Sequence, residues 1–171
     1  MLVLERFPQT GVSVRPGESF ALSVRGSAGL RCFVSVSPQC AGGPETVAMR
    51  DNFDAAYPER RAVIDPAQRQ AMAERFFQMM VDSRHGSEVL TQFIGEIPRS
   101  KAEPHRHLYE EVLMIVRGSG MMWTEGEKYP VRAGDIIFLP RKQVHSLESI
   151  SEDGMLVAGL ICPGNNPTIN Y

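Results

Sequence analysis

The chain has 171 residues and a formal net charge of −2, with 43% hydrophobic and 22% charged residues. A chain of this length forms one domain whose core needs no disulfide or structural metal, and its composition excludes general disorder. The nearly balanced charge and the lack of an apolar run near the ~18 residues of a membrane span exclude nucleic acid and membranes as expected partners.

The N-terminus and the cysteines predict a cytoplasmic protein. Glu5 and Arg6 follow only four residues after the start, so we see no basic leader with a long apolar core. Cys32, Cys40 and Cys162 are odd in number and form no CxxC pair. We therefore expect reduced thiols, and neither a thiolate zinc site nor dithiol redox chemistry.

The first 64 residues predict short strands and turns. The chain contains 12 prolines and 15 glycines, which leave short apolar segments rather than long helical stripes. Residues 12–24 alternate around a Pro-Gly turn and residues 30–36 are rich in strand formers, so two to three strands are expected here. We interpret residues 38–44 as a turn or linker and residues 45–64 as a surface connection.

A short helix is expected over about residues 66–74. Asp65 can cap it, Pro66 fits its first position, and Gln68 stands three residues after the cap. The next run, RFFQMMV, fits a helix or a strand by its periodicity. A polar turn at residues 82–87 and an alternating segment after it favour a hairpin.

Six further strands are expected over residues 111–116, 121–126, 129–134, 136–140, 144–149 and 155–163. Turns every eight to twelve residues or so are typical of a sandwich or barrel. Strand 111–116 is apolar on both alternations, so one face fills the barrel and the other needs a cover from the N-terminal strands or a partner chain. A homodimer is therefore expected.

Two pairs of similar segments suggest an internal repeat. Residues 14–18 (VRPGE) resemble residues 131–135 (VRAGD), and residues 30–38 resemble residues 155–163. Either the first 40 residues belong to a degenerate second barrel, or two β-turns with an acidic end look alike.

Three of the four histidines lie in a pattern suited to a metal site. His105 and His107 are two residues apart, so in a strand both imidazoles point to one face. Glu111 follows at the start of an apolar strand, and His145 starts another. Three imidazoles and a carboxylate suit a first-row divalent ion and leave coordination positions open for substrate. His85 is interpreted as a solvated turn residue.

At these positions the sequence resembles the cupin superfamily over about residues 75–165. The first cupin motif is matched from Gly95 through His105, His107 and Glu111 to Gly118, and the second from Gly134 through Pro140 to His145. The resemblance implies an all-β double-stranded β-helix, or jelly-roll, barrel. It also implies one divalent transition metal (Fe, Mn, Ni, Co, Cu or Zn), held by four ligands: His105, His107, Glu111 and His145.

Three departures from the cupin motifs carry structural expectations. The stretch from Gly95 to His105 is four residues longer than the usual pattern, which suggests a lid or lip. Lys142 replaces a glycine and predicts a different turn, since a side chain resists positive φ. Ser149 replaces an asparagine and is assigned no role.

The candidates for substrate contact are weaker. Cationic residues on the two loops before the ligands either anchor a substrate carboxylate or are solvated charges: Arg99, Lys101, Arg141 and Lys142. Tyr109 either donates its hydroxyl to a metal-bound substrate or packs at a strand bend.

The expected organisation has four parts: a partial cupin-like β segment (1–40), a linker with the short helix (41–74), the barrel (75–165) and a C-terminal tail (166–171). The resemblance implies a metal-dependent enzyme acting on a small oxygen-bearing metabolite, of the dioxygenase, isomerase, decarboxylase or lyase type. The alternative is a non-catalytic module that binds or senses a small molecule. The sequence shows no appended pair of DNA-binding helices, which weakens the version of this alternative in which the module is a regulator.

Overall fold

The computed structural model describes residues 2–4, 9–23, 27, 29–37, 45–48 and 50–164. The expected turn at 38–44 and the expected tail at 166–171 lie outside these residues. No helix of the described part has the length and apolar character that crossing a membrane requires.

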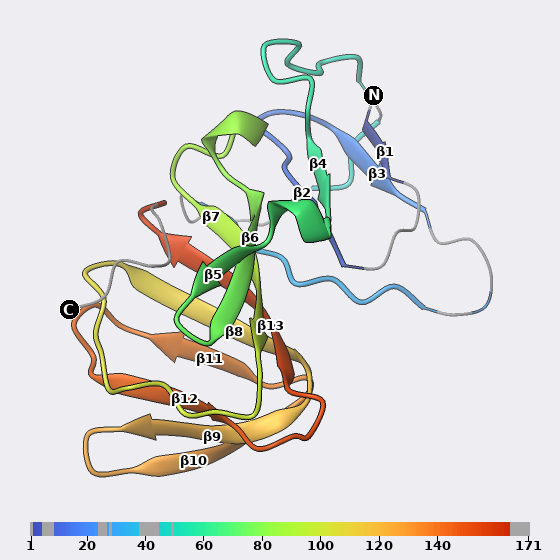
Figure 1. Cartoon of the computed structure of the whole chain (residues 1–171). Helices are drawn as coiled ribbons and strands as arrows, with labels where there is room; N and C mark the ends of the chain where they lie inside the picture. Colours follow the sequence, from blue (N-terminus) through green and yellow to red (C-terminus); the bar gives the residue numbers. More distant parts are fainter. Residues whose placement is uncertain are drawn as a thin grey trace.

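Two antiparallel sheets form the barrel (Figure 1). The larger sheet has six strands, in the order β11 (Ile136–Leu139), β8 (Glu110–Arg117), β13 (Met155–Cys162), β7 (Thr91–Ile97), β6 (Arg75–Val81) and β5 (Gln70–Met72). The smaller sheet has three strands, in the order β10 (Lys128–Arg132), β9 (Ser119–Thr124) and β12 (His145–Ser149). The expected all-β jelly-roll is confirmed, and so is the hairpin, since β6 pairs with β7.

Residues 98–107 lie along β12 and lengthen the smaller sheet. Backbone bridges join Lys101 to Glu148 and His105 to His145, and the Ser149 N–H donates to the Ser100 carbonyl at 2.8 Å. The expected lid or lip is therefore wrong, because the longer stretch is hydrogen-bonded to β12 as an extended segment.

The core lies between the two sheets and follows the strand alternation. On β8, Glu111, Leu113 and Ile115 are buried, whereas the residues between them are half-buried. On β6, Phe77 and Met79 pack in this core, whereas Met80 belongs to a second apolar cluster. Arg75 therefore has the inward-facing parity of its strand.

The second cluster lies on the outer face of the larger sheet and is covered by the same chain. Met80, Ile94 and Leu156 pack against Ala62 and Ile64, which lie at β4 (Arg61–Val63). β4 pairs with β2 (Thr10–Val12), and β1 (Leu2–Leu4) pairs with β3 (Phe20–Leu22). At the other edge of this sheet, Ile136 and Phe138 on β11 are exposed.

Two expectations for the N-terminal region are wrong. Residues 29–37 contain no strand, because the structure gives this segment no strand partner. Residues 45–64 are not only a surface connection, since they end in β4 and include Arg60, whose side chain is 1% exposed. Arg60 forms a two-pronged ion pair with Glu18, with both N···O distances 2.7 Å.

The expected helix over residues 66–74 is also wrong. Asp65 does cap a 3-10 turn, η1 (Pro66–Gln68), by accepting from the Ala67 N–H. The chain then enters β5, which pairs with the start of β6. A helix this short gains little by itself, so pairing with the barrel sheet determines the conformation.

Candidate metal centre

Three histidines converge at one end of the barrel. The ligand atoms offered by His105, His107 and His145 all lie within 4.8 Å of one another. His105 and His145 are held together by their backbones, because each N–H donates to the other's carbonyl, at 3.0 and 2.9 Å. The structure thus joins the two sequence motifs at a single point.

The ring orientations of two of these histidines are set by backbone carbonyls. Nδ1 of His105 lies 2.7 Å from the Glu103 carbonyl, and Nδ1 of His145 lies 2.9 Å from the Gln143 carbonyl. A carbonyl only accepts, so each Nδ1 is the protonated donor and each Nε2 keeps its lone pair. This arrangement is the usual one for imidazoles that bind a metal.

Glu111 lies beside the histidines, on the inward face of β8. Its Oε2 is 3.3 Å from Nε2 of His107 and 3.9 Å from Nε2 of His145. All three of these side chains are less than a tenth exposed. The four residues proposed from the sequence are therefore brought together, and their donor set fits a first-row divalent ion.

Burial keeps the imidazoles in the form that binds a metal. Loss of solvent around His145 lowers its pKa to about 4, although its hydrogen bond to Gln143 opposes this shift. Burial also lowers the pKa of His105, again against a backbone hydrogen bond. Both rings are neutral at neutral pH, so no proton has to be displaced before an ion binds.

Tyr109 packs directly on this cluster. Its ring stacks on that of His107, with a centroid separation of 4.6 Å and an interplanar angle of 11°. Burial, with the nearby charge of Glu111, raises the pKa of the phenol above its ordinary value. Tyr109 therefore remains a neutral phenol that supports His107.

The cationic candidates from the two loops are directed elsewhere. Arg99 pairs with Glu152 at 3.1 Å on the exposed surface, and the ammonium of Lys101 lies 3.5 Å from the centre of the Trp123 ring. Arg141 lies 3.7 Å from a carboxylate oxygen of Glu110. These contacts are those of surface charges.

Lys142 adopts the left-handed turn conformation of the glycine that it replaces in the cupin motif. It adopts a φ of 67°, and its N–H donates to the His107 carbonyl at 2.7 Å. The expected change of turn is wrong, because this hydrogen bond to a ligand-bearing segment holds the left-handed conformation in place.

The expectation for His85 is also wrong. It lies in η2 (Ser83–His85) with 9% of its surface exposed, and its Nδ1 is 3.2 Å from a carboxylate oxygen of Asp82. Asp82 and His85 form a reciprocal cap for this turn. His85 is thus a structural histidine, apart from the three in the cluster.

Arg75 is the charged residue near the cluster that the sequence reasoning missed. Its Nη2 donates to the carbonyl of Leu147, two residues after His145, at 2.5 Å. The signal was available, because Arg75 alternates with the inward-facing Phe77 and Met79. The ambiguity between helix and strand over this run hid it.

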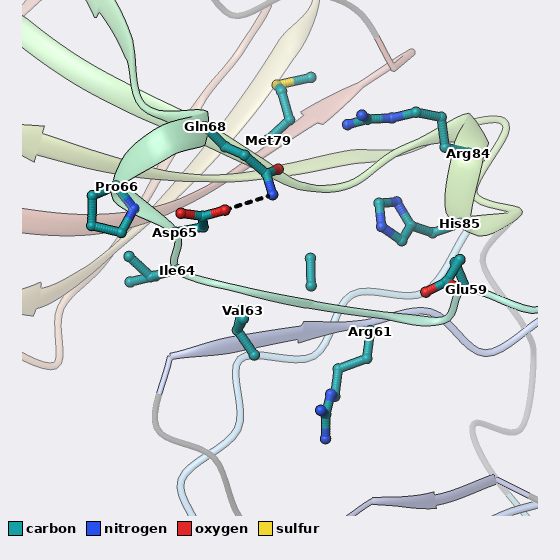
Figure 2. Close-up of a pocket in the computed structure, with 11 residues that line it drawn as sticks. Glu59, Arg61, Val63, Ile64, Asp65, Pro66, Gln68, Met79, Arg84 and His85 are labelled. Atoms are coloured by element: carbon teal, nitrogen blue, oxygen red, sulfur yellow. Dashed lines mark hydrogen bonds between the residues drawn. The ribbon is translucent and has the colours of Figure 1, made fainter.

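A separate cavity of about 540 Å³ contains none of the four predicted ligands (Figure 2). It lies between the segment of β4 and η1 and the turn at η2. Its charged lining is already engaged in part, since Arg84 pairs with Asp82, and Gln68 donates to Asp65. The histidine cluster, rather than this cavity, concentrates groups that can bind a metal.

Comparison with known proteins identifies the barrel region. Residues 96–161 match the family model for the cupin domain. An uncharacterized protein of Methanocaldococcus jannaschii is 40% identical over 52 residues, which cover 30% of this chain and 42% of that protein. An uncharacterized protein of Aquifex aeolicus is 33% identical over 70 residues, which cover 40% of this chain and 57% of that protein. The chain thus spans about half the length of these curated relatives.

Solved structures agree on the fold. KdgF from Halomonas sp. superposes with a TM-score of 0.52 at 20% identity, covering 59% of this chain and 92% of that one. A cupin 2 conserved barrel domain protein from Salinispora arenicola gives a TM-score of 0.53 at 15% identity, covering 59% of this chain and 86% of that one. At these identities the likeness shows the fold alone.

Proposed function

The chain belongs to the cupin superfamily, and on this premise we propose that it binds one divalent transition metal ion and acts with it on a small oxygen-bearing metabolite. The ion is Fe, Mn, Ni, Co, Cu or Zn, and its ligands are the three clustered histidines and Glu111. The observation that carries the proposal is the convergence of the three imidazoles within 4.8 Å, with two of them oriented through Nδ1 by backbone carbonyls.

The metal and the residues around it have separate roles in this proposal. The metal supplies Lewis-acid chemistry and orients oxygen donors when it is bound. The carbonyls of Glu103 and Gln143 hold two imidazoles in the ligating tautomer. Glu111 adds a negative charge that offsets part of the charge of the cation. Dioxygenase, isomerase, decarboxylase and lyase reactions are all compatible with such a site.

Metal analysis tests the proposal. We expect the purified protein, supplied with each candidate ion in turn, to take up one ion per chain. Replacing both His105 and His107 by Ala should remove most of the metal. His85→Ala is the matched control, because it removes a buried imidazole that lies outside the cluster.

The outcomes separate the assignments. Unchanged metal content in the double variant would contradict the site, whereas loss of metal in His85→Ala would point to a different one. Glu111→Gln tests the carboxylate alone, and we expect weaker binding because a neutral amide oxygen replaces a charged ligand. If the loaded protein binds small oxygen-bearing acids and turns none over, the alternative of a non-catalytic binding module holds.

The homodimer stays a prediction. Ile136 and Phe138, 62% and 59% exposed on an edge strand, are a reason to measure the mass of the protein in solution.

A further inference from the structure

Arg75 carries a positive charge on the inward-facing side of β6, where it contacts the smaller sheet. It begins β6 with its side chain on the inward-facing parity, and its guanidinium reaches across to β12, in the opposite sheet. The carbonyl that it contacts, that of Leu147, also accepts from the Ala102 N–H at 3.2 Å. The guanidinium therefore lies where the segment leading to His105 meets the strand that begins at His145.

The charge of Arg75 has no carboxylate partner among the described residues. Its one hydrogen bond there is to the neutral Leu147 carbonyl, through Nη2. A guanidinium has five N–H donors, so most of its donors remain available. Burial lowers the pKa of Arg75, opposed by the charge of the neighbouring Glu74, which is exposed. A partly desolvated cation without a counter-ion favours an anion beside it.

The backbone places Arg75 near the histidine cluster. The Leu147 carbonyl that it contacts is two residues along β12 from His145, and two residues of a strand span about 7 Å. Glu111 is the carboxylate in contact with the histidines, so with a divalent ion bound, the ion and the guanidinium together leave an excess of positive charge in this part of the barrel. Such a field attracts anionic ligands.

We infer that Arg75 is the anion-binding residue of the site and that the ligand is a small carboxylic acid with a second oxygen donor for the metal. The planar fork of the guanidinium matches a carboxylate, whose two oxygens can accept parallel hydrogen bonds. This inference rests on the proposed metal site and narrows its ligand from oxygen-bearing metabolites to organic anions.

The experiment compares a diacid with its own half-amide. The Co²⁺-loaded protein is titrated calorimetrically with oxalate, malonate and succinate, and the acid that binds most tightly is compared with its half-amide. The half-amide keeps one carboxylate for the metal and replaces the other by a neutral group of the same shape. We expect the wild type to prefer the diacid by about 10-fold to 100-fold, the range for a hydrogen bond between charged groups.

Variants then assign this preference to Arg75. Arg75→Gln keeps a donor for the Leu147 carbonyl but removes the charge, and should abolish the preference. Arg75→Lys keeps the charge without the fork and should retain part of it. Arg99→Gln removes the same charge from an exposed, already paired arginine and should change nothing. The comparison of diacid with half-amide on the wild type stands even if a variant fails to fold.

Each failure has its own signature. Bound metal with no preference for any diacid, or with a preference unchanged in Arg75→Gln, overturns the inference and leaves the metal site standing. If inorganic phosphate binds more tightly than every diacid, the carboxylate assignment is wrong and the group that Arg75 recognises is a phosphate. If the wild type takes up no metal, the proposed function fails. The same titrations on the metal-free protein then test whether Arg75 binds the anion. Loss of anion binding in Arg75→Gln would support this role, and equal binding in the variant and the wild type would refute it.

Discussion

Two turns of similar sequence lie in different parts of the molecule and have the same local structure. In the N-terminal region the Arg15 N–H donates to the Glu18 carboxylate at 2.8 Å, and the Glu18 N–H donates back to the Arg15 carbonyl at 3.1 Å. In the barrel, Arg132 and Asp135 make the same two hydrogen bonds, at 2.9 and 3.0 Å. Five residues of sequence are thus enough to specify a turn.

What lies beyond each turn differs. Asp135 leads into β11, and its carbonyl accepts from the Ile115 N–H of β8 at 2.9 Å, so its turn joins strands of the barrel. Glu18 is instead buried, with 6% of its side chain exposed, against Arg60. A local motif therefore sets its own conformation, whereas distant partners decide whether it becomes part of a barrel or of an ion-paired cover.

The first prediction breaks the N-terminal half of this comparison and has the largest expected effect. Arg60→Met leaves the Glu18 carboxylate buried and without its ion pair, which costs about 3–5 kcal/mol of unfolding free energy. Arg132→Met is the control, because that arginine has an exposed side chain and belongs to the equivalent turn through its backbone. Urea unfolding followed by circular dichroism measures both. Equal losses would show that the buried pair does not distinguish the two turns.

The second prediction uses pH on the same pair. Burial raises the pKa of the Glu18 carboxyl, but hydrogen bonds from Arg60 and from two backbone N–H groups outweigh it and lower the pKa from 4.5 to about 2. The folded state therefore binds this proton less readily than the unfolded chain does. The stabilisation is complete above about pH 4.5 and is lost as the pH falls toward 2.

The size of this pH effect is on the order of 3 kcal/mol, from the free energy that corresponds to such a pKa shift. Unfolding free energies measured from pH 5 down to pH 2 should fall more steeply for the wild type than for Glu18→Gln, which has no proton to gain. Parallel curves for the two proteins would refute the assignment.

The third prediction sharpens the likeness of the two turns. Gly17 and Gly134 have φ angles of 81° and 98°, and no atom outside each turn lies within 4 Å of an added Cβ. Alanine at either position is penalised by the backbone alone, by roughly 1–2 kcal/mol. Thermal unfolding should give similar losses for Gly17→Ala and Gly134→Ala. A loss confined to Gly134→Ala would show that the N-terminal turn contributes little to stability.

The sequence predicted the barrel much better than the N-terminal region, for a physical reason. From residue 75 onward, strand alternation and turn residues agree with the pairing seen in the sheets, and four ligand positions could be read from the cupin motifs. Residues 30–36 have a similar strand-forming composition, yet they have no strand partner, whereas the similar residues of β13 lie between β7 and β8. Pairing depends on distant residues, which a local pattern does not report.

The site shows the same limit. His105, His107, Glu111 and His145 were predicted because motif spacing reports them. Motif spacing could not report the contact of Arg75 with the Leu147 carbonyl, which joins two sheets, and the local signal for Arg75 was the alternation along β6. The carbonyls of Glu103 and Gln143 lie only two residues before the histidines that they orient, but ligand spacing does not report these hydrogen bonds. His85 forms a reciprocal cap with Asp82 in the turn, and the polar composition of residues 82–87 did not predict that its side chain is buried.

The last prediction tests a turn in which a side chain stands where the motif has glycine. Lys142 adopts a φ of 67°, a conformation that an L-residue reaches at some cost. Lys142→Gly should relieve this strain and raise the unfolding free energy by about 0.5–1 kcal/mol, less the extra flexibility that glycine adds to the unfolded chain. Lys142→Ala is the matched control, because it removes the charge and keeps the Cβ, so it should bring no gain.

The N–H that Lys142 donates to the His107 carbonyl is a backbone group that all three proteins retain, and their metal content should therefore be the same. A gain in Lys142→Ala as large as that in Lys142→Gly would show that the lysine charge, rather than its backbone, is what destabilises this turn.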